Sequence, residues 1–477
     1  MKFRWNHPMP PEMKTPKSPP VWVFVLLYLV TEGSALLLTL SSWPGGEPLA
    51  SQKFVLDAVV APLLVWVAIS IAVYHALYGG FVYEAAVKNS ERWRLVTRWK
   101  EQSRAGIALL DSVILTPEPD LAERMLSLEG SPPENPGKVM ALDSVDVADG
   151  VSRVRGVLDR LLTPMAAKLT QAARSDSFEI VMQCERQEMS ADVQAVWSEL
   201  KLPGRPRIRW MDNDREVGFA DNWFKEDSHT SYSFSSFHQT PRYRLLLAWH
   251  LNEGGAEVPQ TASEAAVALL LGSTALMQEK PDTKHQAWLL RQIVGEADQV
   301  DRSLALLLRA EQAPPERIRH FWHSRLKGLA QHTTVGAVRD TDLKVEEHAL
   351  DPAIGPQAPV VRWLLPALAA KMAHFGQGAQ LVALPHEKGV ALNLVVKAHT
   401  PADMPWKPEY GYSLIAFEEI CMCMTVVTLA LLVSDNKAWG TFETVVVVLG
   451  VIFSLLFVGA KIFMRRVYTD NFWREHG

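Results

Sequence analysis

The pattern of hydrophobic and polar positions divides the chain into two apolar ends and a mixed middle. Four long apolar runs occur, two near each end, at residues 21–41, 54–78, 412–433 and 441–463. Each is close to the ~20 residues that a helix needs to cross ~30 Å of hydrocarbon. The pattern therefore predicts four transmembrane helices, arranged as one hairpin at each end of the chain.

Basic residues flank these runs unevenly, and the imbalance predicts their orientation. Lysines and arginines precede the first run and follow the second and fourth, whereas each hairpin connector holds a single lysine, Lys53 or Lys437. Because cytoplasmic loops carry the excess of Lys and Arg, both termini and the middle region are expected in the cytoplasm. The predicted parts are an N-terminal tail over 1–20, hairpins over 21–80 and 412–464, a cytoplasmic domain over 85–410 and a C-terminal tail over 465–477.

One carboxyl group lies deep inside a predicted span. Glu32 is in the middle of the first run, roughly 16 Å from its start at a rise of 1.5 Å per residue. An acidic side chain at that depth costs ~2.5–3.5 kcal/mol, so it is expected to face other helices. The hydroxyls of Ser70, Thr425 and Thr428 are candidate partners for hydrogen bonds between helices. A place on an ion or proton path is the other interpretation of Glu32.

In the middle region, patterns typical of strands and helices alternate. Such alternation predicts an α/β domain with a mixed sheet and a helical cover. No internal repeat of fixed period is evident, and residues 262–276 fit either a helix or an interior strand. Strands are expected at 105–115, 178–184, 208–211, 242–250, 380–384 and 390–397, and helices at 151–174, 190–200, 289–308, 315–331 and 360–375.

Composition excludes several classes of protein. The net charge of −5 over 477 residues gives no sign of nucleic-acid binding. Three cysteines provide no disulfide framework, and Cys421 and Cys423 fall inside the third apolar run. The basic residues beside the runs instead favour contact with anionic lipid headgroups, at ~1 kcal/mol each. A lipid bilayer is therefore the first expected partner.

Sequence motifs for catalysis and cofactor binding are absent. The middle region contains no phosphate-binding loop, no paired Cys-x-x-Cys set, no dinucleotide-binding glycine motif and no Gly-x-Ser-x-Gly elbow. Residues 212–218 resemble a calcium loop, but the glycine comes one place late and Trp223 stands where glutamate is required. We therefore predict no catalytic residue, no cofactor and no metal site.

A basic segment in the expected helix 315–331 is a candidate surface for a partner. His320 and His323 are three residues apart, a spacing that a metal could use on a helix, but no third ligand accompanies them there. Arg317 and Arg319 are close by and would repel a cation. The segment is expected either to bind an acidic partner or phosphate headgroups, or to be an ordinary solvated face.

A second candidate surface lies between residues 223 and 243. Aromatic residues alternate there with serines and threonines, a composition typical of recognition surfaces. Contact with a partner, an ordinary long loop and a catalytic role are the three interpretations. The residues proposed for partner binding are Tyr232, Phe234, Phe237 and His238.

Two apolar segments resemble a known fold. Residues 242–250 (RYRLLLAWH) and 263–272 (SEAAVALLLG) are similar to the paired inner strands of thiolases and ketoacyl synthases, and Gly376-Gln377-Gly378 is similar to their closing segment. The resemblance implies a thiolase-like fold over about 177–397. The family's nucleophilic cysteine has no match, because Cys184 falls in an expected strand without a glycine-rich setting. The resemblance therefore implies a degenerate, inactive copy.

The whole layout resembles membrane proteins encoded beside effectors of type VI secretion systems in Gram-negative bacteria. It implies an inner-membrane protein that binds another protein, a secreted toxin or a secretion component, and does not turn over a substrate. The leading hypothesis is an immunity or adaptor protein. A membrane-bound enzyme acting on lipid or acyl substrates is the alternative, and a channel or transporter component with Glu32 in its path is a second one.

Overall fold

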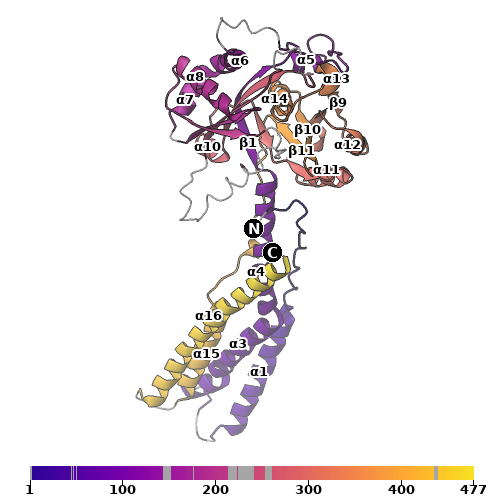
Figure 1. Ribbon diagram of the computed structural model, residues 1–477. Coiled ribbons are helices and arrows are strands. Elements are labelled where there is room, and N and C mark those ends of the chain that lie inside the picture. The colour runs from indigo at the N-terminus through magenta and orange to yellow at the C-terminus, as the bar shows by residue number, and fades with distance from the viewer. Residues whose placement is uncertain are drawn as a thin grey trace. The chain divides into compact units, whose positions relative to one another are not determined.

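The computed structural model divides the chain into two compact units (Figure 1). The first comprises Met1–His7 and Trp99–Ala402, and the second comprises Pro8–Arg98 and Asp403–Gly477. Each unit is considered by itself below. The residues described are 3–44, 46, 48–49, 51–142, 152–175, 177–212, 223, 241–252, 260–434 and 439–476.

A mixed β-sheet is the framework of the first unit. Within the described residues it has 11 strands, in the order β3-β2-β4-β5-β1-β6-β11-β10-β8-β9, with β7 paired to β11 off this path. The predicted α/β domain with a mixed sheet is therefore confirmed. The strands are β1 (Gly106–Leu115), β2 (Phe178–Gln183), β3 (Arg207–Met211), β4 (Tyr243–His250), β5 (Ala265–Gly272), β6 (Ala287–Leu290), β7 (Ile293–Gly295), β8 (Ile318–His323), β9 (Glu346–Ala349), β10 (Ala379–His386) and β11 (Gly389–Val396).

The two halves of this sheet repeat one topology. In the first half β2 is parallel to both β3 and β4, and β5 is antiparallel to both β4 and β1. In the second half β8 is parallel to both β9 and β10, and β11 is antiparallel to both β10 and β6. The halves meet at the antiparallel pair β1–β6. The strand order β3-β2-β4-β5-β1 of the first half thus recurs as β9-β8-β10-β11-β6 in the second half. No periodicity in the sequence indicates this duplication.

Helices cover both faces of the sheet. Successive strand residues point to opposite faces, so Leu245 and Leu247 of β4 enter one core while Leu246 and Ala248 enter the other. Figure 1 shows α6, α7 and α8 beside the first half of the sheet and α11 and α12 beside the second. The helices of this unit are α5 (Leu121–Met125), α6 (Arg153–Leu162), α7 (Ala166–Ala173), α8 (Ser190–Glu199), α10 (Thr274–Glu279), α11 (Val300–Arg309), α12 (Gly328–Arg339), α13 (Leu350–Ile354) and α14 (Val361–His374).

Helix α14 is the element that both halves share. It is mainly apolar and is buried along almost its whole length, including the side chain of Arg362. It contacts β1 and β5 of the first half and β6, β10 and β11 of the second. The indole of Trp363 donates a hydrogen bond to Oε1 of Gln183 at the end of β2. The core of the second half is therefore tied directly to the carboxyl end of a first-half strand.

Two helix predictions were wrong. In the expected helix 315–331, the proline at the start begins only a 3₁₀ turn, and Ile318–His323 form strand β8. The reason is burial on both sides, because Phe321 enters one core and Trp322 the other. The expected helix 289–308 contains the end of β6, all of β7 and only then α11, while β9 was not predicted at all. The ambiguous residues 262–276 form mainly strand β5.

The second unit contains the apolar helices. Three described helices are long and apolar enough, by length and composition, to cross a membrane: Val21–Ser42, Gln52–Ser103 and Thr441–His476. The helix α15 (Phe417–Val433) has 17 residues and is about 25 Å long at 1.5 Å per residue. The structure thus supports three of the four predicted spans, and the fourth stays a prediction. The long elements are α1 (Val21–Ser42), α3 (Ala61–Tyr74), α4 (Gly80–Ser103), which continues into the first unit, and α16 (Thr441–His476).

Glu32 lies half-buried on α1. Among the described residues, its Oε1 atom and the Ser70 hydroxyl each lack a hydrogen-bond partner. Thr425 and Thr428 donate to backbone carbonyls of their own helix, those of Cys421 and Met424. The hydrogen bonds predicted between helices at Glu32 are therefore not formed by these groups.

Candidate functional site

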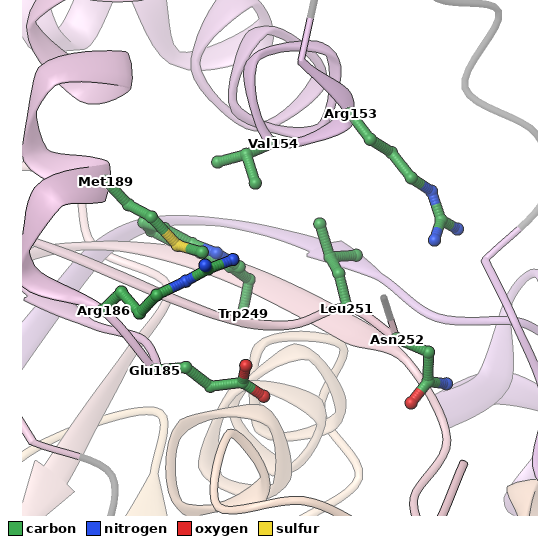
Figure 2. Close-up of a pocket in the computed structure, with 8 residues that line it drawn as sticks. All are labelled: Arg153, Val154, Glu185, Arg186, Met189, Trp249, Leu251 and Asn252. Carbon is green, nitrogen blue, oxygen red and sulfur yellow. The ribbon is translucent and has the colours of Figure 1, made fainter. Parts of the chain in front are cut away.

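A cavity of about 240 Å³ lies at the carboxyl ends of the neighbouring parallel strands β2 and β4 (Figure 2). In α/β sheets, ligands bind outside the carboxyl ends of parallel strands, because loops of variable sequence gather there. The position alone therefore makes this cavity the first candidate for a site. Its lining consists of Arg153, Val154, Glu185, Arg186, Met189, Trp249, Leu251 and Asn252.

Three segments of chain supply these residues. Glu185 and Arg186 follow β2, while Leu251 and Asn252 follow β4. Arg153 opens α6, whose start is fixed by the Ser152 hydroxyl accepting a hydrogen bond from the backbone N–H of Arg155. Figure 2 shows the side chains from these segments converging on one space. The site is thus built by the fold and not by any contiguous motif.

A buried carboxylate orients one arginine of the cavity. Glu264 precedes β5, and its two oxygens accept hydrogen bonds from the Arg153 guanidinium at 2.7 and 2.6 Å. It also accepts from the backbone N–H groups of Asn252 and Leu142, both at 2.8 Å. Burial raises the pKa of Glu264, but these hydrogen bonds outweigh it and leave the pKa lowered. Glu264 is therefore a fixed anion that holds both Arg153 and Asn252 in place.

Part of the cavity lining is apolar. It consists of Val154, Met189, Leu251 and the indole of Trp249. Trp249 is 3% exposed, and its Nε1–H has no acceptor among the described residues. A buried donor without a partner costs ~1–3 kcal/mol. A ligand that offers an acceptor to this N–H would recover part of that cost.

Cys184 comes directly after β2 but does not have the properties of a nucleophile. Its side chain is fully buried, and its Sγ lies 3.1 Å from the carbonyl oxygen of Arg186. Burial raises the pKa of the thiol to about 11 despite this hydrogen bond. Because the thiolate is the reactive form of cysteine, this side chain is inert near neutral pH. This agrees with the absence of a matching nucleophilic cysteine in the sequence.

The predicted basic helix face does not exist. Arg317 is in the 3₁₀ turn before β8, and Arg319 is exposed on β8 itself. His320 and His323 are buried and, three residues apart on a strand, point to opposite faces of the sheet. The other residues proposed for partner binding, Tyr232, Phe234, Phe237 and His238, lie outside the described residues, as does most of the calcium-like segment 212–218.

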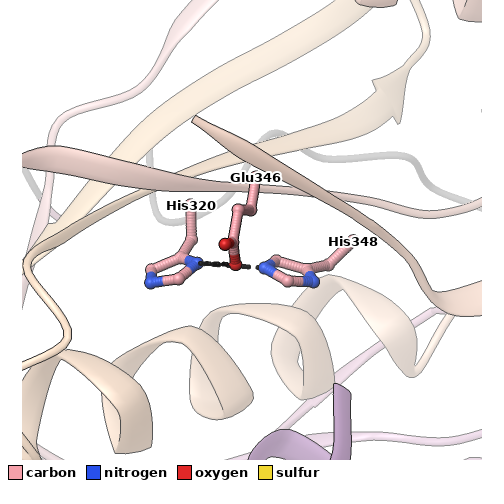
Figure 3. A group of neighbouring side chains, drawn as sticks. All are labelled: His320, Glu346 and His348. Carbon is pink, nitrogen blue, oxygen red and sulfur yellow. Dashed lines mark hydrogen bonds and ion pairs between the residues drawn. The ribbon is translucent and has the colours of Figure 1, made fainter. Parts of the chain in front are cut away.

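The structure instead places His320 beside two residues of β9 (Figure 3). Its Nδ1 lies 3.0 Å from Nε2 of His348 and 3.7 Å from Oε2 of Glu346. On the other face, His323 Nε2 lies 3.1 Å from Oε1 of Glu347. Because residues 315–331 were expected to form a helix, the sequence did not identify Glu346, Glu347 and His348 as neighbours of the two histidines. The signal was the alternation Glu346-x-His348, which puts both side chains on one face of a strand.

Comparison with solved structures finds ketosynthases, a thiolase and OleA among the similar folds. The oxazolomycin ketosynthase domain of Streptomyces albus JA3453 is 11% identical, with a TM-score of 0.41, over 63% of this chain and 98% of that one. The peroxisomal 3-ketoacyl-CoA thiolase of Saccharomyces cerevisiae, described as two core domains of identical topology, is 9% identical with a TM-score of 0.39, over 61% and 98%. At these identities the likeness concerns the fold alone.

OleA from Xanthomonas campestris gives a further similar structure, 9% identical with a TM-score of 0.37 over 61% of this chain and 98% of that one. No protein-family model matches the chain, and no curated protein matches it either. The α/β fold itself is shown by the mixed sheet and its helices. The expectation of a type VI secretion-associated immunity or adaptor protein finds no support, because the similar structures are ketosynthases, a thiolase and OleA. That prediction was wrong.

Proposed function

We propose that this chain is a membrane-anchored protein that acts on lipid or acyl substrates and binds an acyl-bearing anion in the cavity between Arg153 and Trp249. One observation carries the proposal. A guanidinium that a buried carboxylate holds in position lines the same small cavity as four apolar side chains. This combination suits a ligand with a charged end and a hydrocarbon end.

The charged end of the ligand would bind the arginine side. The guanidinium of Arg153 carries five N–H donors in a planar fork, of which Glu264 takes one on each terminal nitrogen. The three N–H groups that Glu264 does not take are donors that a carboxylate or a phosphate could accept from. Arg186 lines the same cavity, together with the Glu185 carboxylate, which lies 3.1 Å from Nδ1 of His250. We infer that the ligand presents a carboxylate or a phosphate ester.

The hydrocarbon end would bind the wall formed by Val154, Met189, Trp249 and Leu251. Burial of apolar surface contributes about 25 cal/mol per Å². The cavity, at about 240 Å³, lies below the ~300–1,000 Å³ typical of sites for drug-sized ligands. It therefore suits a short acyl group, or the polar end of a longer chain, and not a whole lipid.

The apolar helices of the second unit suit a protein that takes its substrate from a bilayer. Three of them are long and apolar enough to cross a membrane. We propose that α15 is the fourth span, with both termini and the first unit on the cytoplasmic side, because the flanking lysines and arginines favour that orientation. The thiol of Cys184 has no part in the proposed activity, since it stays protonated near neutral pH.

Calorimetric titration of the nanodisc-reconstituted chain with octanoate tests the proposal. We expect saturable binding in nanodiscs that hold protein, in excess of partition into empty ones. Octanol lacks the charge and acetate lacks the chain, so both are expected to bind at least tenfold more weakly. The change Trp249→Phe keeps an aromatic ring but removes the N–H with the five-membered ring that carries it, and Arg186→Ala removes a charged side chain from the lining. Each is expected to weaken octanoate binding severalfold.

The matched control is Arg302→Ala, which removes an exposed arginine of α11. It is expected to bind octanoate like the unchanged protein. Equal affinity for octanoate in the Trp249→Phe, Arg186→Ala and control proteins would contradict the proposed site. Binding that scales only with the amount of lipid would contradict the proposed activity of the first unit.

A further inference from the structure

Two strands in the second half of the sheet bring together three side chains that could hold a metal ion (Figure 3). Strands β8 and β9 are parallel and pair in a register that sets His320 opposite Glu346 and Trp322 opposite His348. Residues opposite one another, and those two apart on a strand, share a face of the sheet. All four side chains therefore lie on the same face.

The separations of the three candidate ligand atoms are close to those of a coordination sphere. The facing ring nitrogens of His320 and His348 are 3.0 Å apart, Oε2 of Glu346 is 3.7 Å from Nδ1 of His320, and the candidate ligand atoms all lie within 4.8 Å of one another. Two ligands at ~2.0–2.1 Å from a tetrahedral zinc ion are roughly 3.3 Å apart. Small side-chain movements would therefore place an ion between the three atoms.

Both histidines of the cluster are buried, each with 7% of its surface exposed. An ion held between them would therefore be largely shielded from solvent on the side of the two rings.

His348 is held by contacts beyond the three candidate ligands. The backbone carbonyl of Met125 accepts a hydrogen bond from its ring, and the indole of Trp322 lies beside it with ring centres 4.8 Å apart. Because Nε2 faces His320, the other ring nitrogen is the donor to Met125. A backbone carbonyl that fixes the tautomer and orientation in this way is the usual outer partner of a metal-binding histidine.

A hydrogen bond between the two histidine rings does not explain the position of the Glu346 carboxylate. Its side chain is 72% exposed on strand β9 at the edge of the sheet. Figure 3 nevertheless shows its carboxylate turned toward the two buried rings. An anionic oxygen beside two imidazole nitrogens completes a set of three ligands of the kind that zinc accepts, and the exposed side leaves room for water.

We propose that His320, Glu346 and His348 form a binding site for a divalent transition metal, with zinc as the best fit and water as a fourth ligand. Two imidazoles and one carboxylate are donors that suit zinc and do not suit calcium or magnesium, which prefer oxygen ligands. The site is separate from the cavity at β2 and β4 and does not depend on the function proposed for it.

Zinc titration of the full chain in nanodiscs tests the proposal. The protein is purified without a histidine tag, treated with a chelator and titrated with zinc ion by calorimetry, with Co²⁺ as a spectroscopic probe of ligand number. We expect one zinc per chain. His320→Ala and His348→Ala are expected to abolish this binding, and Glu346→Gln to weaken it tenfold or more. His332→Ala, which removes an exposed histidine of α12, is expected to bind like the unchanged protein.

Glu346→Gln keeps the test decisive if a buried histidine variant fails to fold, because the exposed glutamate is not part of the core. An unchanged zinc affinity in a folded Glu346→Gln protein, together with an unchanged Co²⁺ absorption spectrum, would overturn the proposed ligand set. The absence of stoichiometric zinc binding by the unchanged protein would overturn the site altogether.

Discussion

Glu264 is the residue on which the geometry of the cavity depends most. Its side chain is 1% exposed and accepts four hydrogen bonds, two of them from Arg153. The side chain of Arg153 is 38% exposed, so water can solvate its charge once the carboxylate is removed, and the cost is smaller than for a fully buried ion pair. We expect Glu264→Gln to lower the free energy of unfolding of the first unit by about 1–2 kcal/mol, measured by urea denaturation at pH 7.

The same carboxylate predicts how stability depends on pH. The pKa of Glu264 is lower in the folded chain than its ordinary value of 4.5. Its contribution is therefore fully present above pH 4.5 and is lost as the pH falls through the folded-state pKa. Between pH 7 and pH 3, urea denaturation should show a smaller loss of stability for Glu264→Gln than for the unchanged protein. Parallel curves would contradict this assignment.

Labelling with iodoacetamide tests the prediction that the thiol of Cys184 is unreactive in the folded chain. Burial raises its pKa to about 11, so we expect iodoacetamide to leave it unlabelled in the folded chain at pH 8 and to label it once the chain is unfolded. Mass spectrometry of the tryptic peptides measures this directly. Cys184→Ala should retain octanoate binding, and rapid labelling of Cys184 in the folded protein at pH 8 would show that the thiol is reactive.

At the scale of elements, α14 joins the two halves of the sheet. Leu365 is fully buried in it, and replacing a buried leucine by alanine costs ~2–5 kcal/mol. We expect Leu365→Ala to shift the urea midpoint of the whole first unit in a single transition, followed by circular dichroism. Leu329→Ala is the control, because that leucine is 59% exposed on α12 and should change stability by less than ~0.5 kcal/mol. Two separate transitions would show that the halves unfold independently.

Several strands could be predicted from the sequence because most of their residues are apolar and buried. β1, β2, β4, β10 and β11 were expected close to their observed bounds, since each consists mainly of apolar residues. β8 could not be predicted in the same way, because its buried positions include His320 and His323, which read as polar. The proline before it also signalled a helix start. The histidines make sense only once the neighbouring strand β9 is known.

The cavity residues could not be predicted for a related reason. Arg153, Glu185 and Trp249 come from three distant segments that meet only because β2 and β4 are neighbours. The sequence alone does not indicate that β2 and β4 pair with one another. The duplicated topology was equally invisible, because the two halves share strand order and direction and not a residue pattern.

At the scale of the whole molecule, the orientation proposed for the membrane helices can be tested at the connectors. We expect single cysteines introduced at Lys53 or Lys437, in a chain with its natural cysteines changed to alanine, to react with a membrane-impermeant maleimide added outside intact cells. A cysteine introduced at Arg205, in the first unit, should react only after permeabilisation. The reverse pattern of labelling would contradict the proposed orientation.

Photolabelling of the full chain in nanodiscs with a short fatty acid that carries a diazirine, followed by peptide mapping, would locate the acyl-binding site directly. We expect labelling within residues 243–252 and around Met189, competed by octanoate and reduced by Trp249→Phe. Label confined to the apolar helices Val21–Ser42 and Thr441–His476, insensitive to octanoate, would show partition into the bilayer and contradict the proposed site.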